Sequence, residues 1–71
     1  MHNDQIRKIA MRLSGEEMGH LRQMQLHGTE DVRDFGGAPA ILKSLEVHDL
    51  VFRTGSTVSL THRGKLVARS L

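Results

Sequence analysis

The sequence predicts a small domain that is mainly α-helical and carries one short β-hairpin. Between residues 3 and 49 the apolar residues recur every three or four positions, which is the period of helices that bury one face. Between residues 50 and 60 they alternate with polar residues around a Thr-Gly-Ser sequence, a pattern typical of two strands joined by a tight turn. A chain of 71 residues has room for one hydrophobic core, so we expect a single domain over residues 1–71.

The composition restricts the class of protein. There is no cysteine, which excludes disulfides, thiolate metal sites and cysteine nucleophiles and fits a reducing compartment. Residues 1–13 lack the apolar core of a signal peptide, and no apolar run approaches the roughly 20 residues of a membrane span. We therefore expect a cytoplasmic protein with no membrane partner. The net charge of +2 is compatible with a nucleic-acid partner without requiring one.

The first expected helix spans residues 3–13 and carries an apolar stripe and a basic face. The stripe, at the spacing i, i+3, i+4 and i+7, consists of Ile6, Ile9, Ala10 and Leu13. Arg7, Lys8 and Arg12 fall outside it, and we interpret them as a solvated surface rather than a phosphate contact. Its large members Ile6, Ile9 and Leu13 are a candidate interface, because a second copy could dock there in place of the domain's own core.

Capping residues mark the start of two further helices. Ser14 and Glu17 form a capping-box pattern, and the helix that they open is expected to end at Gly28. Residues 29–37 fit a shorter helix, because Thr29 suits its N-cap and acidic residues occupy its first turn.

The second half of the chain combines a helix, the hairpin and a last helix. A proline occupies the first position of the helix expected over residues 39–49. Residues 50–53 and 57–60 are the expected strands, and the tip between them offers a glycine for a positive φ. Thr61 then caps a final helix over residues 62–71.

This second half resembles a winged helix-turn-helix domain. The run ILKSLEVHDLV (residues 41–51) is similar to the end of a recognition helix that enters the first wing strand, where many such regulators carry Leu-x-x-Leu-x-x-x-Gly-Leu-Val. The run VSLTHRGKLVARSL (residues 58–71) resembles their second wing strand and following helix, with the Leu-Thr-x-x-Gly pattern of MarR-type proteins. The chain also resembles short winged-helix proteins of phages and mobile elements. The resemblance covers residues 42–71 and implies about four to five helices with a two-stranded wing.

The resemblance implies a small DNA-binding, transcription-regulatory protein that needs no cofactor. It would contact double-stranded DNA through the helix over residues 39–49 and the basic wing. The implied DNA-binding residues are Lys43, Ser44, Arg53, Thr54, Ser56, Thr57, His62, Arg63 and Lys65. Two positions depart from the family pattern. Residues 38–40, which would approach the bases, are Ala-Pro-Ala and lack hydrogen-bonding side chains, and Asp49 stands where glycine is usual.

Other functions are weighed against DNA binding. The alternative is a protein-interaction or homodimerisation module on the same scaffold, without DNA binding. We expect no enzyme, because the sequence contains neither GxxxxGK[ST] nor HExxH. We also expect no metal site, because the five histidines form no HxxxH or HxH pair. His20 and His27 are seven positions apart, roughly on one helix face, and His48 and His62 are remote in sequence. His48 is expected to be partly buried near a helix end.

Overall fold

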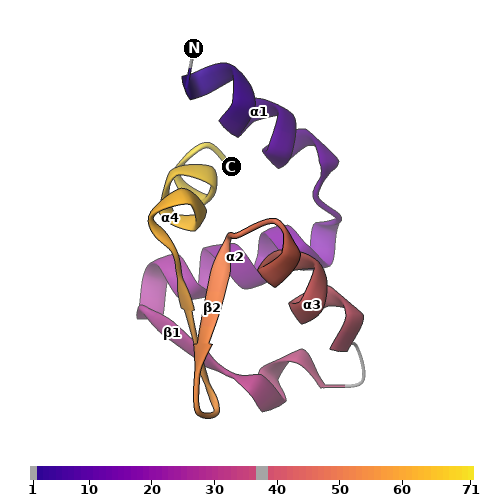
Figure 1. Cartoon of the computed structure of the whole chain (residues 1–71), viewed down its shortest axis with the longest axis vertical. Helices are drawn as coiled ribbons and strands as arrows, with labels where there is room; N and C mark the ends of the chain where they lie inside the picture. Colours follow the sequence, from indigo (N-terminus) through magenta and orange to yellow (C-terminus); the bar gives the residue numbers. More distant parts are fainter. Residues whose placement is uncertain (1, 37–38) are drawn as a thin grey trace.

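The chain combines α-helices with a three-stranded antiparallel sheet in the computed structural model, which describes residues 2–36 and 39–71 (Figure 1). The elements, in order, are α1 (His2–Arg12), α2 (Gly15–His27), β1 (Thr29–Asp31), the 3-10 helix η1 (Val32–Phe35), α3 (Pro39–Val47), β2 (Val51–Thr54), β3 (Thr57–Leu60) and α4 (His62–Arg69). The prediction of a mainly helical domain with a small antiparallel sheet is confirmed. Gly37 and Ala38, expected at the end of one helix and in the first turn of the next, lie outside the described residues.

The segment after α2 is a strand, so the helix predicted to start at Thr29 is wrong. β1 pairs antiparallel with β3, with Thr29 opposite Ser59 and Asp31 opposite Thr57. The sheet therefore has the strand order β1-β3-β2, where the sequence predicted a two-stranded hairpin. The segment forms a strand although its residues suit a helix start. The edge of β3 offers backbone N–H and C=O groups, and an extended segment beside it can form hydrogen bonds with them.

The helical turn starts after β1 and is capped by Asp31. The Asp31 carboxylate accepts a hydrogen bond from the Arg33 amide, and the Asp34 carboxylate accepts one from the Asp31 amide, at 2.8 Å each. Hydrogen bonds from the Arg33 amide and guanidinium, together with its charge, lower the pKa of Asp31 below its ordinary value. This reciprocal capping box explains why the acidic residues of this segment stand where they do.

The hairpin forms where the sequence predicted it, but its first strand is shifted by one residue, so Thr54 belongs to β2 and the turn is shorter than predicted. Val51 lies opposite Leu60 and Thr54 lies opposite Thr57, which leaves Gly55 and Ser56 as a two-residue turn. Gly55 has a φ of +62°, the conformation that the first central residue of a type II′ turn requires. The prediction of a positive φ at Gly55 is confirmed.

The core lies between the sheet and the helices α2, α3 and α4, and it is almost wholly aliphatic. Its buried members are Leu21, Met24, Phe35, Leu42, Leu45, Leu50, Val51, Val58, Leu60, Val67 and Ala68. The side chains proposed as a candidate interface, Ile6, Ile9 and Leu13, are half-buried and pack against this core from α1. The stripe on α1 therefore serves the domain's own packing.

A partly buried histidine holds β1 and η1 against α2. The His20 Nδ1 atom lies 3.0 and 3.2 Å from the two carboxylate oxygens of Glu30. Its ring stacks on Phe35, with 4.0 Å between the ring centroids and 16° between the planes. His27, considered with His20 for a metal, is exposed. His20 therefore joins three elements of the N-terminal half.

The turn between α3 and β2 is tied to the start of α4. Asp49 adopts a φ of +60°, a left-handed conformation that favours glycine. The Thr61 hydroxyl donates to the Asp49 carbonyl at 2.6 Å and accepts from the Gly64 amide at 2.9 Å, while the Thr61 amide donates to the Leu50 carbonyl at 3.0 Å. A Cβ atom on Gly64 would overlap the Leu50 carbonyl oxygen. Residues 49–50 and 61–64 therefore form one packed junction.

The junction makes Gly64 intolerant of a methyl group. We expect Gly64→Ala to lower the free energy of unfolding by about 1–3 kcal/mol, because the Leu50 backbone must move. Gly19→Ala is the matched control: it lies in α2 with no atom within 4 Å of the added Cβ, so we expect stabilisation by about 0.5–1 kcal/mol. Urea unfolding of both variants measures the difference. If both variants changed the free energy of unfolding equally, the close approach of Gly64 to the Leu50 backbone would be contradicted.

Candidate nucleic-acid interface

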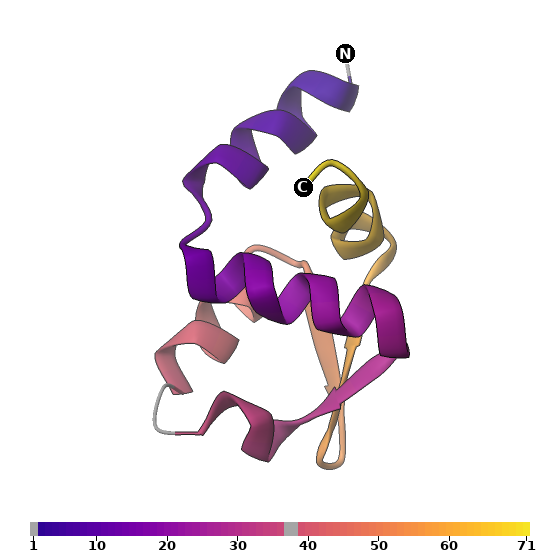
Figure 2. The same cartoon turned by 180° about the vertical axis from the view of Figure 1, so that it is seen from behind.

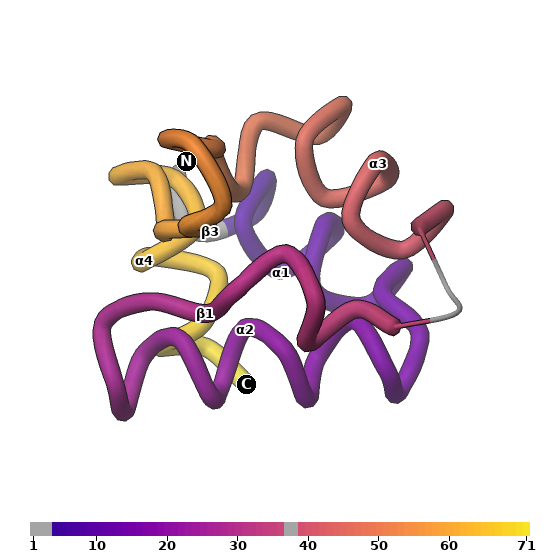
Figure 3. Tube along the Cα trace, turned by 90° about the horizontal axis from the view of Figure 1, so that it is seen from below, coloured from indigo at the N-terminus to yellow at the C-terminus, as the bar shows by residue number. Residues whose placement is uncertain are grey.

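The helix α3 and the hairpin lie on the same side of the molecule. In Figure 1 they stand in front of α2, and in Figure 2, seen from behind, α2 stands in front of them. Figure 3 shows the same separation along another direction, with α2 on one side and α3 and the hairpin on the other. The hairpin tip forms one end of the molecule, and α1 lies at the opposite end.

The exposed face of α3 carries one charged side chain. Its exposed residues are Pro39, Ala40, Lys43 and Val47. Lys43 is the cation among them, and Val47 is an aliphatic side chain with 73% of its surface exposed. The first turn of α3 thus offers apolar groups, as the sequence indicated for Pro39 and Ala40. Hydrogen-bonded readout of bases by the exposed face of α3 would have to come from Lys43.

Arg53, the cation expected at the wing, is bound to a carboxylate on α3. Its Nε and Nη2 atoms donate to the two oxygens of Glu46 at 3.2 and 3.0 Å. The Arg53 side chain remains 48% exposed. Because an exposed ion pair of this kind contributes about 0–1 kcal/mol, a phosphate could displace the carboxylate at small cost. In the free protein the pair fixes β2 beside α3.

Ser44, expected as a DNA contact, is engaged inside the protein. Its hydroxyl donates to a Glu17 carboxylate oxygen at 3.0 Å, and the other oxygen accepts from the Ser14 amide at 3.0 Å. Burial tends to raise the pKa of Glu17, but hydrogen bonds from Ser14 and Ser44 and the nearby His48 outweigh it and lower the pKa below its ordinary value. The carboxylate joins the start of α2 to α3. Ser44 therefore lies outside the exposed face of α3.

The wing tip presents three hydroxyl side chains to solvent. Thr54, Ser56 and Thr57 are all exposed around Gly55. The Ser56 carbonyl accepts a hydrogen bond from the Val32 amide at 2.8 Å, which holds the tip against η1. These hydroxyls could donate to phosphate oxygens, which is how such side chains commonly position a protein on a duplex.

The DNA-binding residues expected on α4 lie apart from the hairpin tip. His62, Arg63 and Lys65 are exposed, but α4 lies at the end of the molecule away from the hairpin tip (Figure 1). Arg63 faces α1, whereas Lys65 lines a second groove with Arg69 and Phe52, whose side chain is 47% exposed. The predicted DNA-binding set is thus divided between the wing side and two other surfaces.

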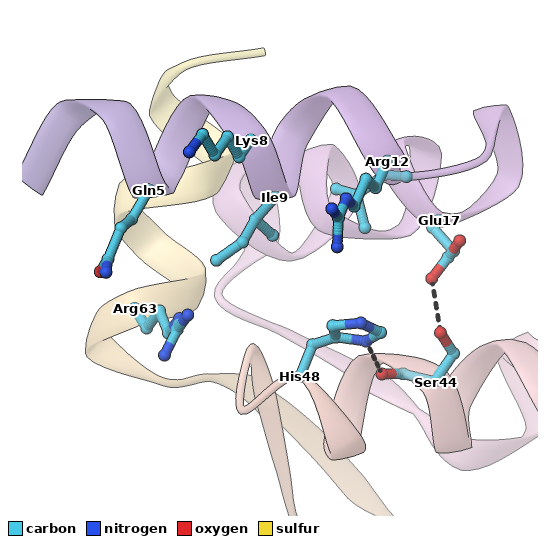
Figure 4. Close-up of a pocket in the computed structure, with 9 residues that line it drawn as sticks. Gln5, Lys8, Ile9, Arg12, Glu17, Ser44, His48 and Arg63 are labelled. Carbon is cyan, nitrogen blue, oxygen red and sulfur yellow. Dashed lines mark hydrogen bonds between the residues drawn. The ribbon is translucent and has the colours of Figure 1, made fainter.

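A basic cleft between α1, α3 and α4 was missed by the sequence analysis. Its volume is about 250 Å³. Its lining includes Lys8 and Arg12, interpreted from the sequence as a solvated surface, and Arg63 (Figure 4). His48, expected to be partly buried, is exposed and also lines the cleft. The sequence carries no local signal for this site because its members come from helices that are distant along the chain.

Comparison of the chain with protein-family models, with curated proteins and with solved structures finds no match. Within residues 2–36 and 39–71, no helix combines the length and the apolar character needed to cross a bilayer. The chemistry of the chain is therefore inferred from the exposed face of α3, the wing tip and the basic cleft.

The Glu17 carboxylate predicts a dependence of stability on pH. Because its pKa is lowered on folding, its contribution to the free energy of unfolding is complete above the ordinary value of 4.5 and is lost as the pH falls through the lowered pKa. We expect wild type to be more stable than Glu17→Gln at pH 7 and this advantage to shrink in acid. Urea unfolding across this pH range measures it. If the difference in the free energy of unfolding between wild type and Glu17→Gln stayed constant in acid, a stabilising role of the Glu17 charge would be contradicted.

Proposed function

We propose that the chain is a winged-helix domain that binds double-stranded DNA through α3 and the hairpin, as a small transcription-regulatory protein. One observation supports this most directly: Arg53 of β2 forms a bidentate ion pair with Glu46 of α3, and its shorter hydrogen bond is 3.0 Å long. This pair places α3 and the hairpin side by side on one surface. The order of elements from α3 through β2 and β3 to α4 also agrees with the resemblance of residues 42–71.

Phosphate contacts would supply most of the affinity. Lys43 is the exposed cation of α3, and the hydroxyls of Thr54, Ser56 and Thr57 surround the wing tip. With α3 in the major groove, its apolar side chains could contact thymine methyl groups, but few hydrogen bonds to base edges are available. We therefore expect modest sequence specificity and a dependence on salt concentration set by the two cations Lys43 and Arg53.

Glu46 opposes this interaction in the free protein. Its carboxylate holds Arg53 and adds negative charge to the surface that would meet the phosphates. On binding, Arg53 would exchange the Glu46 carboxylate for a phosphate group, two oxygens of which can accept the same pair of N–H bonds. Glu46 would then stand unpaired beside the duplex, and its removal should favour binding.

Substitutions of Lys43 and Glu46 test the proposal. We expect Lys43→Ala to weaken binding of a random duplex and to reduce the slope of log affinity against log salt by about 1. We expect Glu46→Gln to tighten binding roughly fivefold, since like charges about 4 Å apart cost about 1 kcal/mol in water. Fluorescence anisotropy between 50 and 200 mM salt measures both.

The control for Glu46→Gln is Asp4→Asn, which removes one negative charge from an exposed position of α1. It should change the affinity by less than a factor of two. Equal gains in both variants would show that net charge alone governs binding. If wild type shows no measurable binding to the duplex at the lowest salt concentration, the proposal is contradicted.

The alternative is a protein-interaction module, and exposed apolar side chains favour it. They are Met11, Leu26, Val47 and Phe52, which lie on four different elements. The α1 stripe that could have supported a homodimer packs on the domain's own core. A chain that fails to bind DNA and sediments as a dimer would support this alternative.

A further inference from the structure

The cleft between α1, α3 and α4 concentrates positive charge. Three cations line it, Lys8 and Arg12 from α1 and Arg63 from α4. In the part of the chain that the structure describes, none of the three forms a salt bridge. Like charges gathered at one cleft repel one another, so an anion that neutralised them would be stabilised there.

The one acidic residue in the lining does not neutralise these cations by direct pairing. Glu17 directs one carboxylate oxygen to the Ser14 amide and the other to the Ser44 hydroxyl, both at 3.0 Å. Figure 4 shows the second of these bonds at the edge of the group of labelled side chains. Three cations against one carboxylate leave the cleft with a positive charge at neutral pH.

His48 also lines the cleft. Its Nδ1 atom donates to the Ser44 carbonyl at 2.7 Å, because a carbonyl can only accept. Nε2 is then the ring nitrogen that remains for a ligand, and it becomes a donor when the ring is protonated. Figure 4 shows His48 and Arg63 on the side of the cleft opposite Arg12 and Ile9. Side chains from α1, from α4 and from the turn after α3 thus line the same cleft.

We propose that this cleft binds the phosphate group of a small phosphorylated molecule. Two guanidinium groups, Arg12 and Arg63, match the geometry of phosphate oxygens, and a phosphate monoester carries close to two negative charges at neutral pH. Ile9 and Leu13 supply an apolar wall for the rest of the ligand. The volume of about 250 Å³ suits a small molecule.

Such a ligand would connect α1 to the rest of the domain. Lys8 and Arg12 come from α1, whereas His48 follows α3 and Arg63 belongs to the first turn of α4. A phosphate held by both sides would stabilise the folded state in proportion to its occupancy, because it binds only where the helices are assembled. This inference goes beyond the proposed DNA contact, which uses α3 and the hairpin tip.

The test is an NMR titration of ¹⁵N-labelled protein with inorganic phosphate, with chloride adjusted to hold the ionic strength constant. We expect saturable shifts at Ile9, Arg12, His48 and Arg63. Arg12→Gln should weaken phosphate binding at least tenfold, and Arg63→Gln should do the same from the other side. The control Arg7→Gln, exposed on α1 outside the cleft lining, should change the affinity by less than twofold. Shifts that never saturate, or equal losses in Arg7→Gln and Arg12→Gln, would overturn the proposal.

A second probe, phenyl phosphate, tests the apolar wall. It should bind at least threefold more tightly than inorganic phosphate, and Leu13→Ala should remove this advantage while leaving inorganic phosphate unaffected. Equal affinities of the two probes for wild type would overturn the assignment of an organic phosphate.

Duplex DNA distinguishes the source of the phosphate. Addition of a duplex to the phosphate-saturated protein should leave the shifts of Arg12 and Arg63 in place. Displacement of phosphate by the duplex would assign the cleft to the DNA backbone and overturn the small-molecule ligand. Phosphate binding by a chain that binds no duplex would instead leave this inference standing and contradict the proposed function.

Discussion

The contact between Gly64 and the Leu50 carbonyl fixes the relative positions of the second-half elements. Because Gly64 has no Cβ, α4 can approach the turn between α3 and β2 closely enough for Thr61 to bond to both Asp49 and Leu50. The same threonine caps α4 through the Gly64 amide. One Thr-x-x-Gly sequence therefore sets the direction of the hairpin relative to α3 and brings the first turn of α4 toward α1. Both the proposed DNA surface and the basic cleft depend on this junction.

Side-chain hydrogen bonds and an ion pair connect other elements, and they also determine which polar side chains are exposed. Arg53 and Glu46 fix the wing beside α3, while Ser44 and Glu17 fix α3 beside the start of α2. The first pair lies at the surface, so a DNA phosphate can compete for Arg53. The second is partly buried and removes Ser44 from the exposed surface. The hydrogen bonds that stabilise the fold thus decide which of the predicted polar residues remain free for a ligand.

The features that the sequence predicted correctly depend on local interactions. The capping box of Ser14 with Glu17, the cap at Thr61 and the positive φ of Gly55 each involve residues within three positions of one another. A short-range pattern is enough to identify them. The mainly helical class followed from the same kind of evidence.

The features that the sequence did not predict depend on distant pairing. Residues 29–31 form a strand because β3, almost thirty positions later, offers an edge, and helix-capping propensity is too weak to oppose it. The basic cleft likewise needs Arg12 of α1, His48 after α3 and Arg63 of α4 to lie on one cleft. The residues expected on α4 lie apart from the hairpin tip because α4 packs away from it (Figure 1). Arg63 and Lys65 are two positions apart on one helix, so they point in different directions and line different grooves.

The most direct measurement is an NMR titration of labelled protein with a short random DNA duplex, first at low salt and then at moderate salt. DNA binding through α3 and the hairpin predicts shifts at Lys43, Arg53, Thr54 and residues 56–57, fading as the salt concentration rises. The amides of α1 should not shift. An absence of shifts at low salt, or shifts confined to α1 and α4, would contradict α3 and the wing as a DNA-binding surface.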